Sequence, residues 1–332
     1  MNSPRLILLP LLLSACFLSA FAQPAAPDSS KLFHFFLPEK SWALELDLHG
    51  FQPPDLDFAP DLRSAKLTAR HPKSGFMVTA QINPARNNRP TTAERDGMIK
   101  RLRKDGFDLL DLKTYERDGR AYLEYTIKGS PKIPAPAGFQ QRNVFVFMAQ
   151  DGAWVDVHVS KTNFTASDAA GLDAFVRTAA VIDTFQPASM DYYLPGSVLY
   201  RRDNYEGAII WLSRALEEEK KKPILSHDQR LILIEKLGVA HGMTGHLRQA
   251  RAVLAYGLAQ DPEFPMFYYN IACIDAEDGD LASALENLRL TLQHRANMIP
   301  GETWPDPIKD SSFKAYVKDS LFQEVAKAFR RP

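Results

Sequence analysis

The chain contains 332 residues, 45% of them hydrophobic and 24% charged, and its 40 basic and 40 acidic side chains give a formal net charge of zero. This composition excludes a disordered polyampholyte, a collagen-like chain and a miniprotein held by disulfides. The balanced charge argues against a dedicated nucleic-acid-binding protein, which usually carries an excess of basic residues. A chain of this length is expected to form about two domains.

Residues 1–22 have the three parts of a secretory signal peptide. Arg5 precedes an apolar run that ends near Leu18, and small residues up to Ala22 provide a cleavage site. The apolar run is shorter than the about 20 residues needed to cross a bilayer. We therefore expect cleavage after Ala22, a periplasmic or secreted mature protein, and a linker rich in Pro, Ala and Ser at residues 23–30.

An alternative processing route starts from the segment LSAC at residues 13–16, which resembles a bacterial lipobox. In that case Cys16 is lipidated, becomes the first mature residue and provides the protein's contact with a membrane. The apolar run argues against this route because it continues through Phe17 and Leu18. If Cys16 leaves with the signal peptide instead, Cys273 is the one remaining cysteine and no internal disulfide can form.

Residues 31–186 alternate between apolar and polar side chains with the period of two that is typical of β-strands. The predicted strands are the segment from Trp42 to Leu48 and the segments AKLTAR, GFMVTAQIN, LLDLKTYER, RAYLEYTIKG, NVFVFMAQ and AWVDVHVS. Asp118-Gly119 and Asp151-Gly152 predict the turns of two hairpins that join the last four segments in pairs.

Two helices are predicted in the same region. Thr91 and Glu94 have the spacing of a capping box before a helix that extends to about Lys104. Ser167 can cap a second helix, whose apolar face is Ala169, Leu172, Phe175, Val176 and Ala179. The order of elements predicts an α+β domain, with one antiparallel sheet and both helices on one face. This order, with the ending WVDVHVS, resembles the PsbP-like family, which implies an accessory or binding domain.

Residues 189–294, in the region from residue 187 to residue 332, contain an internal repeat, in which two copies are related by a shift of 34 residues. Leu237 aligns with Ile271, and the same shift relates Gly238 to Ala272, Gly245 to Gly279, Leu247 to Leu281, Ala250 to Ala284, Leu254 to Leu288 and Leu258 to Leu292. This is the period of the tetratricopeptide repeat, and the region resembles that family. An earlier copy begins near Ser189, with Gly196 at the small position. The resemblance implies an all-α solenoid of three helix hairpins followed by a pair of capping helices.

The resemblance also implies a concave groove, lined by the first helix of each hairpin, that binds an extended or helical peptide. The matching positions are Tyr193, Ser197 and Arg201 in the first copy, Glu235 and Val239 in the second, and Tyr269, Asn270, Cys273 and Glu277 in the third. We expect no metal and no cofactor there. In the alternative interpretation, segments of the protein itself fill the groove.

Asp156 and His158 are the candidates for chemistry on the sheet domain. Their spacing places both side chains on one face of a strand, but a metal site needs three or four ligands, so we interpret them as a polar sheet face with a hydrogen-bonded histidine. His241 and His246 are five residues apart, whereas helical ligand pairs are three or four apart. No nucleophile elbow, phosphate loop or dinucleotide fingerprint occurs in the sequence.

The sequence therefore predicts an exported, non-enzymatic scaffold or adaptor that binds a protein or peptide in the bacterial cell envelope and no nucleic acid. Two alternatives remain open. One is an enzyme or ligand-binding protein with its site on the sheet domain, around Asp156 and His158. The other is a lipid-anchored envelope assembly factor.

Overall fold

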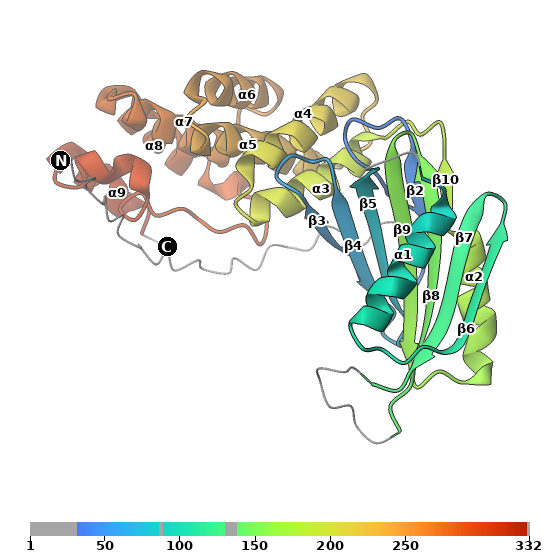
Figure 1. Cartoon of the computed structure of the whole chain (residues 1–332). Coiled ribbons are helices and arrows are strands. Elements are labelled where there is room, and N and C mark those ends of the chain that lie inside the picture. The colour runs from blue at the N-terminus through green and yellow to red at the C-terminus, as the bar shows by residue number, and fades with distance from the viewer. Residues whose placement is uncertain (1–31, 86–88, 130–137, 331–332) are drawn as a thin grey trace, which may run out of the picture.

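The computed structural model describes residues 32–85, 89–129 and 138–330. The predicted signal peptide, the linker and Cys16 lie outside these residues. Figure 1 shows a sheet at one end of the molecule and a row of helix hairpins at the other. No helix in the described ranges has both the length and the apolar content needed to span a bilayer.

A seven-stranded antiparallel sheet with the order β3-β4-β5-β9-β8-β7-β6 forms most of the first half. Its strands are β3 (Asp55–Phe58), β4 (Ala65–Arg70), β5 (Met77–Pro84), β6 (Leu110–Arg117), β7 (Arg120–Ile127), β8 (Gln141–Gln150) and β9 (Ala153–Thr162). The turns at Asp118-Gly119 and Asp151-Gly152 join β6 to β7 and β8 to β9, as predicted. All four turn residues have positive φ, as a type I′ turn requires.

Both faces of this sheet are covered, which corrects the prediction that the helices share one face. Helix α1 (Thr91–Lys104) packs on the face that carries Leu123 and Phe145, and α2 (Ala169–Thr178) lies over the opposite face, as Figure 1 shows. The cause is in β8, where the consecutive residues from Asn143 to Met148 are all buried. Successive side chains of a strand point to opposite faces, so both faces of this strand need a cover.

Neither predicted helix cap forms. Thr91 is already the first residue of α1, and Pro90 occupies the cap position without a side-chain hydrogen bond. Ser167 lies inside a single 3₁₀ turn, Ala166–Asp168, that precedes α2. There Asp168 accepts hydrogen bonds from the backbone nitrogen and the hydroxyl of Thr165. The cap therefore forms at Thr165, two residues earlier than predicted.

A second, three-stranded sheet with the order β1-β2-β10 lies on the α2 side of the large sheet. It consists of β1 (Phe33–Phe35), β2 (Ala43–Leu46) and β10 (Ala180–Ile182). The sequence predicts β2 alone among these strands, because three-residue strands are too short to show an alternation. The four-residue strand β3 of the large sheet is missed as well. Ala43, Leu44 and Leu46 are all buried, so β2 is covered on both faces.

The helical half contains the three predicted hairpins. They are α3 (Ser189–Arg201) with α4 (Tyr205–Lys221), α5 (His227–Met243) with α6 (Leu247–Gln260), and α7 (Pro265–Glu277) with α8 (Leu281–Gln293). The small positions lie where paired helices cross closely. A Cβ atom on Gly196 would lie 2.7 Å from the Leu212 side chain, and one on Gly238 would lie 2.7 Å from that of Leu254.

The loop between the first two hairpins, residues 222–226, closes around a buried carboxylate. Glu219 is 3% exposed and accepts a hydrogen bond of 2.7 Å from the hydroxyl of Ser189. The same carboxylate accepts from the backbone nitrogens of Ile224 and Leu225 at 3.1 and 3.2 Å. Glu219 thereby attaches the connecting loop to the start of α3 and satisfies backbone groups that would otherwise be buried without partners.

The two halves share one hydrophobic core. Trp211 of α4 lies between Phe36 and Phe58 of the sheet half, with ring centroids 5.1 and 5.2 Å away. Arg202, which follows α3, donates a hydrogen bond of 2.6 Å to the carbonyl oxygen of Leu56 in β3 and pairs with Asp57 at 3.2 Å. The hydrophobic core therefore continues across the change from strands to helices near residue 187.

Candidate functional site: the inner face of the helix hairpins

The inner face of the hairpins is formed by their first helices, α3, α5 and α7, which contact one another. The chain's own residues 298–317, here called the strap, lie on this face. After α8 the strap extends back toward the first hairpin, returns to α7 through the 3₁₀ helix η3 (Ser311–Tyr316) and leads into α9 (Ser320–Ala328), as Figure 1 shows. The predicted pair of capping α-helices is thus one 3₁₀ helix and one α-helix, and they follow a long irregular segment.

The strap is held on the third hairpin by three of the predicted groove residues. The hydroxyl of Tyr269 donates a hydrogen bond of 2.8 Å to Asp310, and the Sγ atom of Cys273 lies 3.8 Å from the same carboxylate oxygen. Ser312 donates a hydrogen bond of 2.8 Å to Glu277. These are polar contacts of the kind that the sequence predicts for a bound peptide, and residues of the same chain make them.

An aromatic anchor lies next to these polar contacts. Phe313 is fully buried, and its ring centroid lies 6.1 Å from that of Tyr269 in an edge-on arrangement and 5.4 Å from that of Phe322 in α9. Phe329 lies on the other side of Tyr269, at 6.2 Å, and stacks on Trp304 of the strap. Tyr269 is therefore both the hydrogen-bond donor and part of the hydrophobic contact surface for the strap.

A buried polar cluster lies at the other end of the inner face. The ammonium group of Lys236 lies 3.3 Å from the Ser197 hydroxyl and 5.5 Å above the ring of Tyr193. Burial raises the pKa of the neighbouring Glu235 to about 8, and the charge of Glu302 in the strap acts in the same direction. Burial also lowers the pKa of Lys236 to about 8. The strap thus brings a second carboxyl group to a site that already contains one.

The remaining predicted groove residues lie around these two groups. The amide of Asn270 interacts with the Glu235 carboxyl group and acts to lower its pKa. Val239 is half-buried on α5, and Arg201 at the end of α3 is exposed. Burial raises the pKa of the Cys273 thiol well above its usual range, so this cysteine remains protonated and serves as a packing residue.

Asp156 and His158 lie on one face of β9, as predicted, but they do not form a joint site. The Nε2 atom of His158 lies 3.0 Å from the Oδ1 atom of Asn143, and its ring stacks on Phe145 at 4.0 Å. Burial lowers the pKa of His158 to about 4. Burial raises the pKa of Asp156 to about 6, against the opposing charge of Arg101 in α1. This geometry agrees with a polar sheet face and a hydrogen-bonded, neutral histidine.

Other potential sites contain no group of interacting ligands. In the described part of the chain, no three His, Cys, Asp or Glu side chains are placed to hold a metal ion. The rings of His241 and His246 meet edge-on with centroids 6.0 Å apart, and His246 instead contacts the hydroxyl of Thr244. Two cavities of about 340 and 460 Å³ lie at the junction of the two halves, and the loop Pro38–Lys40 lines both of them. Neither cavity includes Asp156 or His158.

Sequence reasoning missed Glu302 and Asp310 of the strap and Lys236 on α5, and it assigned Phe313 to the capping helices that cover the last repeat rather than to the groove. The strap has no period of two or 3.6 before residue 311, so it gives no secondary-structure signal. Lys236 directly follows Glu235, which matches the family pattern. The sequence interpretation gave this helix an apolar packing face and assigned no role to a charged residue at position 236. The strap agrees with the alternative interpretation of the sequence, in which segments of the protein itself fill the groove.

The chain consists of an α+β sheet half followed by three stacked helix hairpins. No family model and no curated protein matches it. A solved structure described as PcrH in complex with the chaperone binding region of PopB is similar to part of it, with a TM-score of 0.30 and 16% identity. That similarity covers 42% of this chain and 93% of the PcrH chain. A score this low carries no argument about function, and the resemblance of the sheet half to PsbP-like domains stays a prediction.

Proposed function

We propose that this protein is an exported, non-enzymatic adaptor of the bacterial cell envelope, and that it binds an extended segment of a partner protein on the inner face of its helix hairpins. The observation that supports this proposal is the strap itself. A segment of the chain itself, Asp310 and the 3₁₀ helix η3 that follows it, already lies on this face and is bound by Tyr269, Cys273 and Glu277. A surface that binds one such segment has the shape and the hydrogen-bonding groups to bind another.

The rigidity of the molecule also supports an adaptor. The sheet half packs on the first hairpin through Trp211 and Arg202, so a partner on the inner face is held in a defined position relative to the sheet. The candidate residues of the sheet domain give no comparable support to an enzyme. His158 is neutral and stacked on Phe145, and neither junction cavity includes it.

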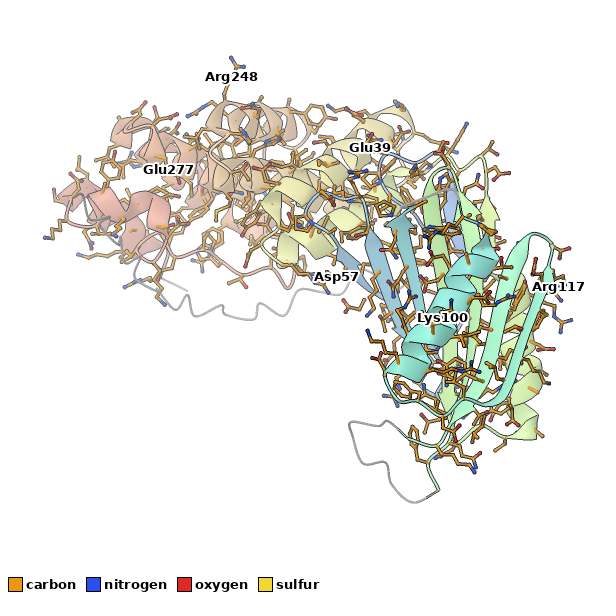
Figure 2. The ribbon with its side chains drawn as sticks, in the orientation of Figure 1. Glu39, Asp57, Lys100, Arg117, Arg248 and Glu277 are labelled. Atoms are coloured by element: carbon orange, nitrogen blue, oxygen red, sulfur yellow. The ribbon has the colours of Figure 1, made fainter. Side chains whose placement is uncertain are left out.

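Site-specific photo-crosslinking in intact cells tests this proposal. A photoreactive side chain replaces Glu277, which is exposed at the end of α7 beside the strap. The matched control replaces Arg248, which extends outward from the outer helix α6 in Figure 2. We expect attachment of one or a few envelope proteins from position 277 and none from position 248. Equal labelling from both positions, or labelling from 248 alone, would contradict the proposal.

The exported location needs a separate measurement. Mass spectrometry of the mature N-terminus should find a chain that begins at Gln23. A diacylglyceryl group on Cys16 would instead establish the lipid-anchored alternative, and an intact N-terminus beginning at Met1 would contradict export through either route.

A further inference from the structure

We infer that the inner face recognises a partner segment with one helical turn that carries a carboxylate and, three residues later, an aromatic ring, and that residues 310–313 of the strap, at the start of η3, occupy this site until such a segment displaces them. This inference rests on the proposed function, because it names the class of partner for the same surface. The motif in the strap is Asp310-Ser311-Ser312-Phe313.

The position of the carboxylate is defined by groups on α7. Asp310 faces the hydroxyl of Tyr269 at 2.8 Å and the Sγ atom of Cys273 at 3.8 Å. Burial raises the pKa of both Tyr269 and Cys273, so both keep their protons and remain donors. Two protonated donors that converge on one oxygen favour an acceptor that carries negative charge over a neutral one.

The position of the aromatic ring is a pocket whose walls are aromatic. Phe313 is fully buried between Tyr269 and Phe322, and Phe322 belongs to α9 rather than to the strap. Helix α9 packs against α8. One wall of the pocket therefore comes from the hairpins and the other from α9, and both stay in place when the strap alone leaves.

The strap is built so that it can leave. It is a loop held at both ends, by α8 before it and by α9 after it, and from residue 298 to residue 310 it contains no helix or strand. Opening the strap disturbs the 3₁₀ helix η3 but no α-helix or strand, and it adds conformational entropy. Because its ends stay anchored, the strap remains close to its site and competes with any partner that binds there.

The test measures binding of a fluorescent peptide with the sequence of residues 306–317, DPIKDSSFKAYV, to the full mature chain by fluorescence anisotropy. The protein variant Asp310→Ala/Phe313→Ala removes both anchors of the strap and should bind the peptide at least about tenfold more tightly than the unaltered chain. The control variant Ser311→Ala/Lys314→Ala changes two exposed residues of the same segment and should bind like the unaltered chain. A peptide with Asn at the position of Asp310 and Ala at the position of Phe313 should bind none of these proteins.

A second measurement covers the case in which the double variant does not fold. Hydrogen exchange of the unaltered chain should show faster exchange of residues 298–317, and unchanged exchange of α3 to α8, when the peptide is in excess. Absence of binding to the opened variant, or unchanged strap exchange with excess peptide, would overturn the inference. Crosslinking from position 277 could still succeed in that case, so the proposed function and this inference fail separately.

Discussion

The hydroxyl of Tyr269 and the carboxylate of Asp310 form a hydrogen bond of 2.8 Å between residues that are 41 positions apart in the chain. Tyr269 lies on the first helix of the third hairpin, where the repeat pattern predicts a ligand-binding side chain. Its partner belongs to the strap, which no periodicity predicts. This one bond shows how the inner face holds a segment of its own chain, and it determines the first of the predictions below.

Replacing Tyr269 with Phe should loosen the strap without unfolding the hairpins. The change leaves the Asp310 carboxylate without its strongest donor, and we expect the free energy of local opening of the strap to fall by about 1–2 kcal/mol. Hydrogen exchange of residues 298–317 measures this. The matched control is Tyr268→Phe, because that hydroxyl bonds to the carbonyl oxygen of Pro262 and not to the strap. Equal effects of the two substitutions would contradict the assigned role.

Replacing Gly238 with Ala should destabilise the second hairpin. The new methyl group would lie 2.7 Å from the Leu254 side chain, so the two helices would have to separate, at a cost of about 1–3 kcal/mol in the free energy of unfolding. Gly242→Ala is the control on the same helix, because a Cβ there meets nothing within 4 Å. The control should stabilise by up to about 1 kcal/mol, and thermal or chemical denaturation compares the two.

Replacing Glu219 with Ala should cost about 2–4 kcal/mol of stability, because the Ser189 hydroxyl and the backbone nitrogens of Ile224 and Leu225 lose a buried acceptor. The control is Glu218→Ala, one residue away, where the carboxylate pairs with Lys221 near the surface. Removal of that exposed pair should change stability by less than about 1 kcal/mol. A midpoint of denaturation that is the same for both variants would contradict the prediction.

The pKa of His158 is lowered from 6.5 to about 4 because the ring is buried. The unfolded chain therefore binds a proton at this residue first as the pH falls. The stability that His158 contributes is complete above about pH 6.5 and is lost progressively as the pH falls toward 4, by on the order of 3 kcal/mol. NMR titration of the ring should find a midpoint near 4. In His158→Gln this part of the pH dependence should disappear, and an unchanged profile would show that the histidine is not buried.

Replacing Trp211 with Ala should destabilise the sheet half as well as the helical half. The indole packs on Phe36 and Phe58 across the junction, and removal of such a ring costs about 3–5 kcal/mol. Hydrogen exchange should show lower protection in β3, which contains Phe58, and in α4 together. Loss of protection confined to the hairpins would mean that the two halves unfold independently, despite their common core.

Much of the fold follows from local patterns. The repeat pattern predicts three hairpins, and Asp118-Gly119 and Asp151-Gly152 predict two tight turns. Both kinds of prediction depend on residues that lie close together in the chain within each hairpin or turn. The covering of both sheet faces is missed, although consecutive buried residues in β8 contain the information. Three-residue strands such as β1 and β10 are missed because they depend on pairing with a distant strand rather than on their own sequence.

For the candidate site, the sequence by itself determined one half: the first helices of the hairpins and the side chains that they direct inward, such as Tyr269 and Glu277. Helical periodicity alone places those residues on one face. The tertiary structure decided the other half, namely that Asp310 and Phe313 occupy this face and that Trp211 joins the hairpins to the sheet. Such contacts depend on the return of an irregular segment over a long distance, and they are set by packing and hydrogen bonding in the folded state, which leave no period in the sequence.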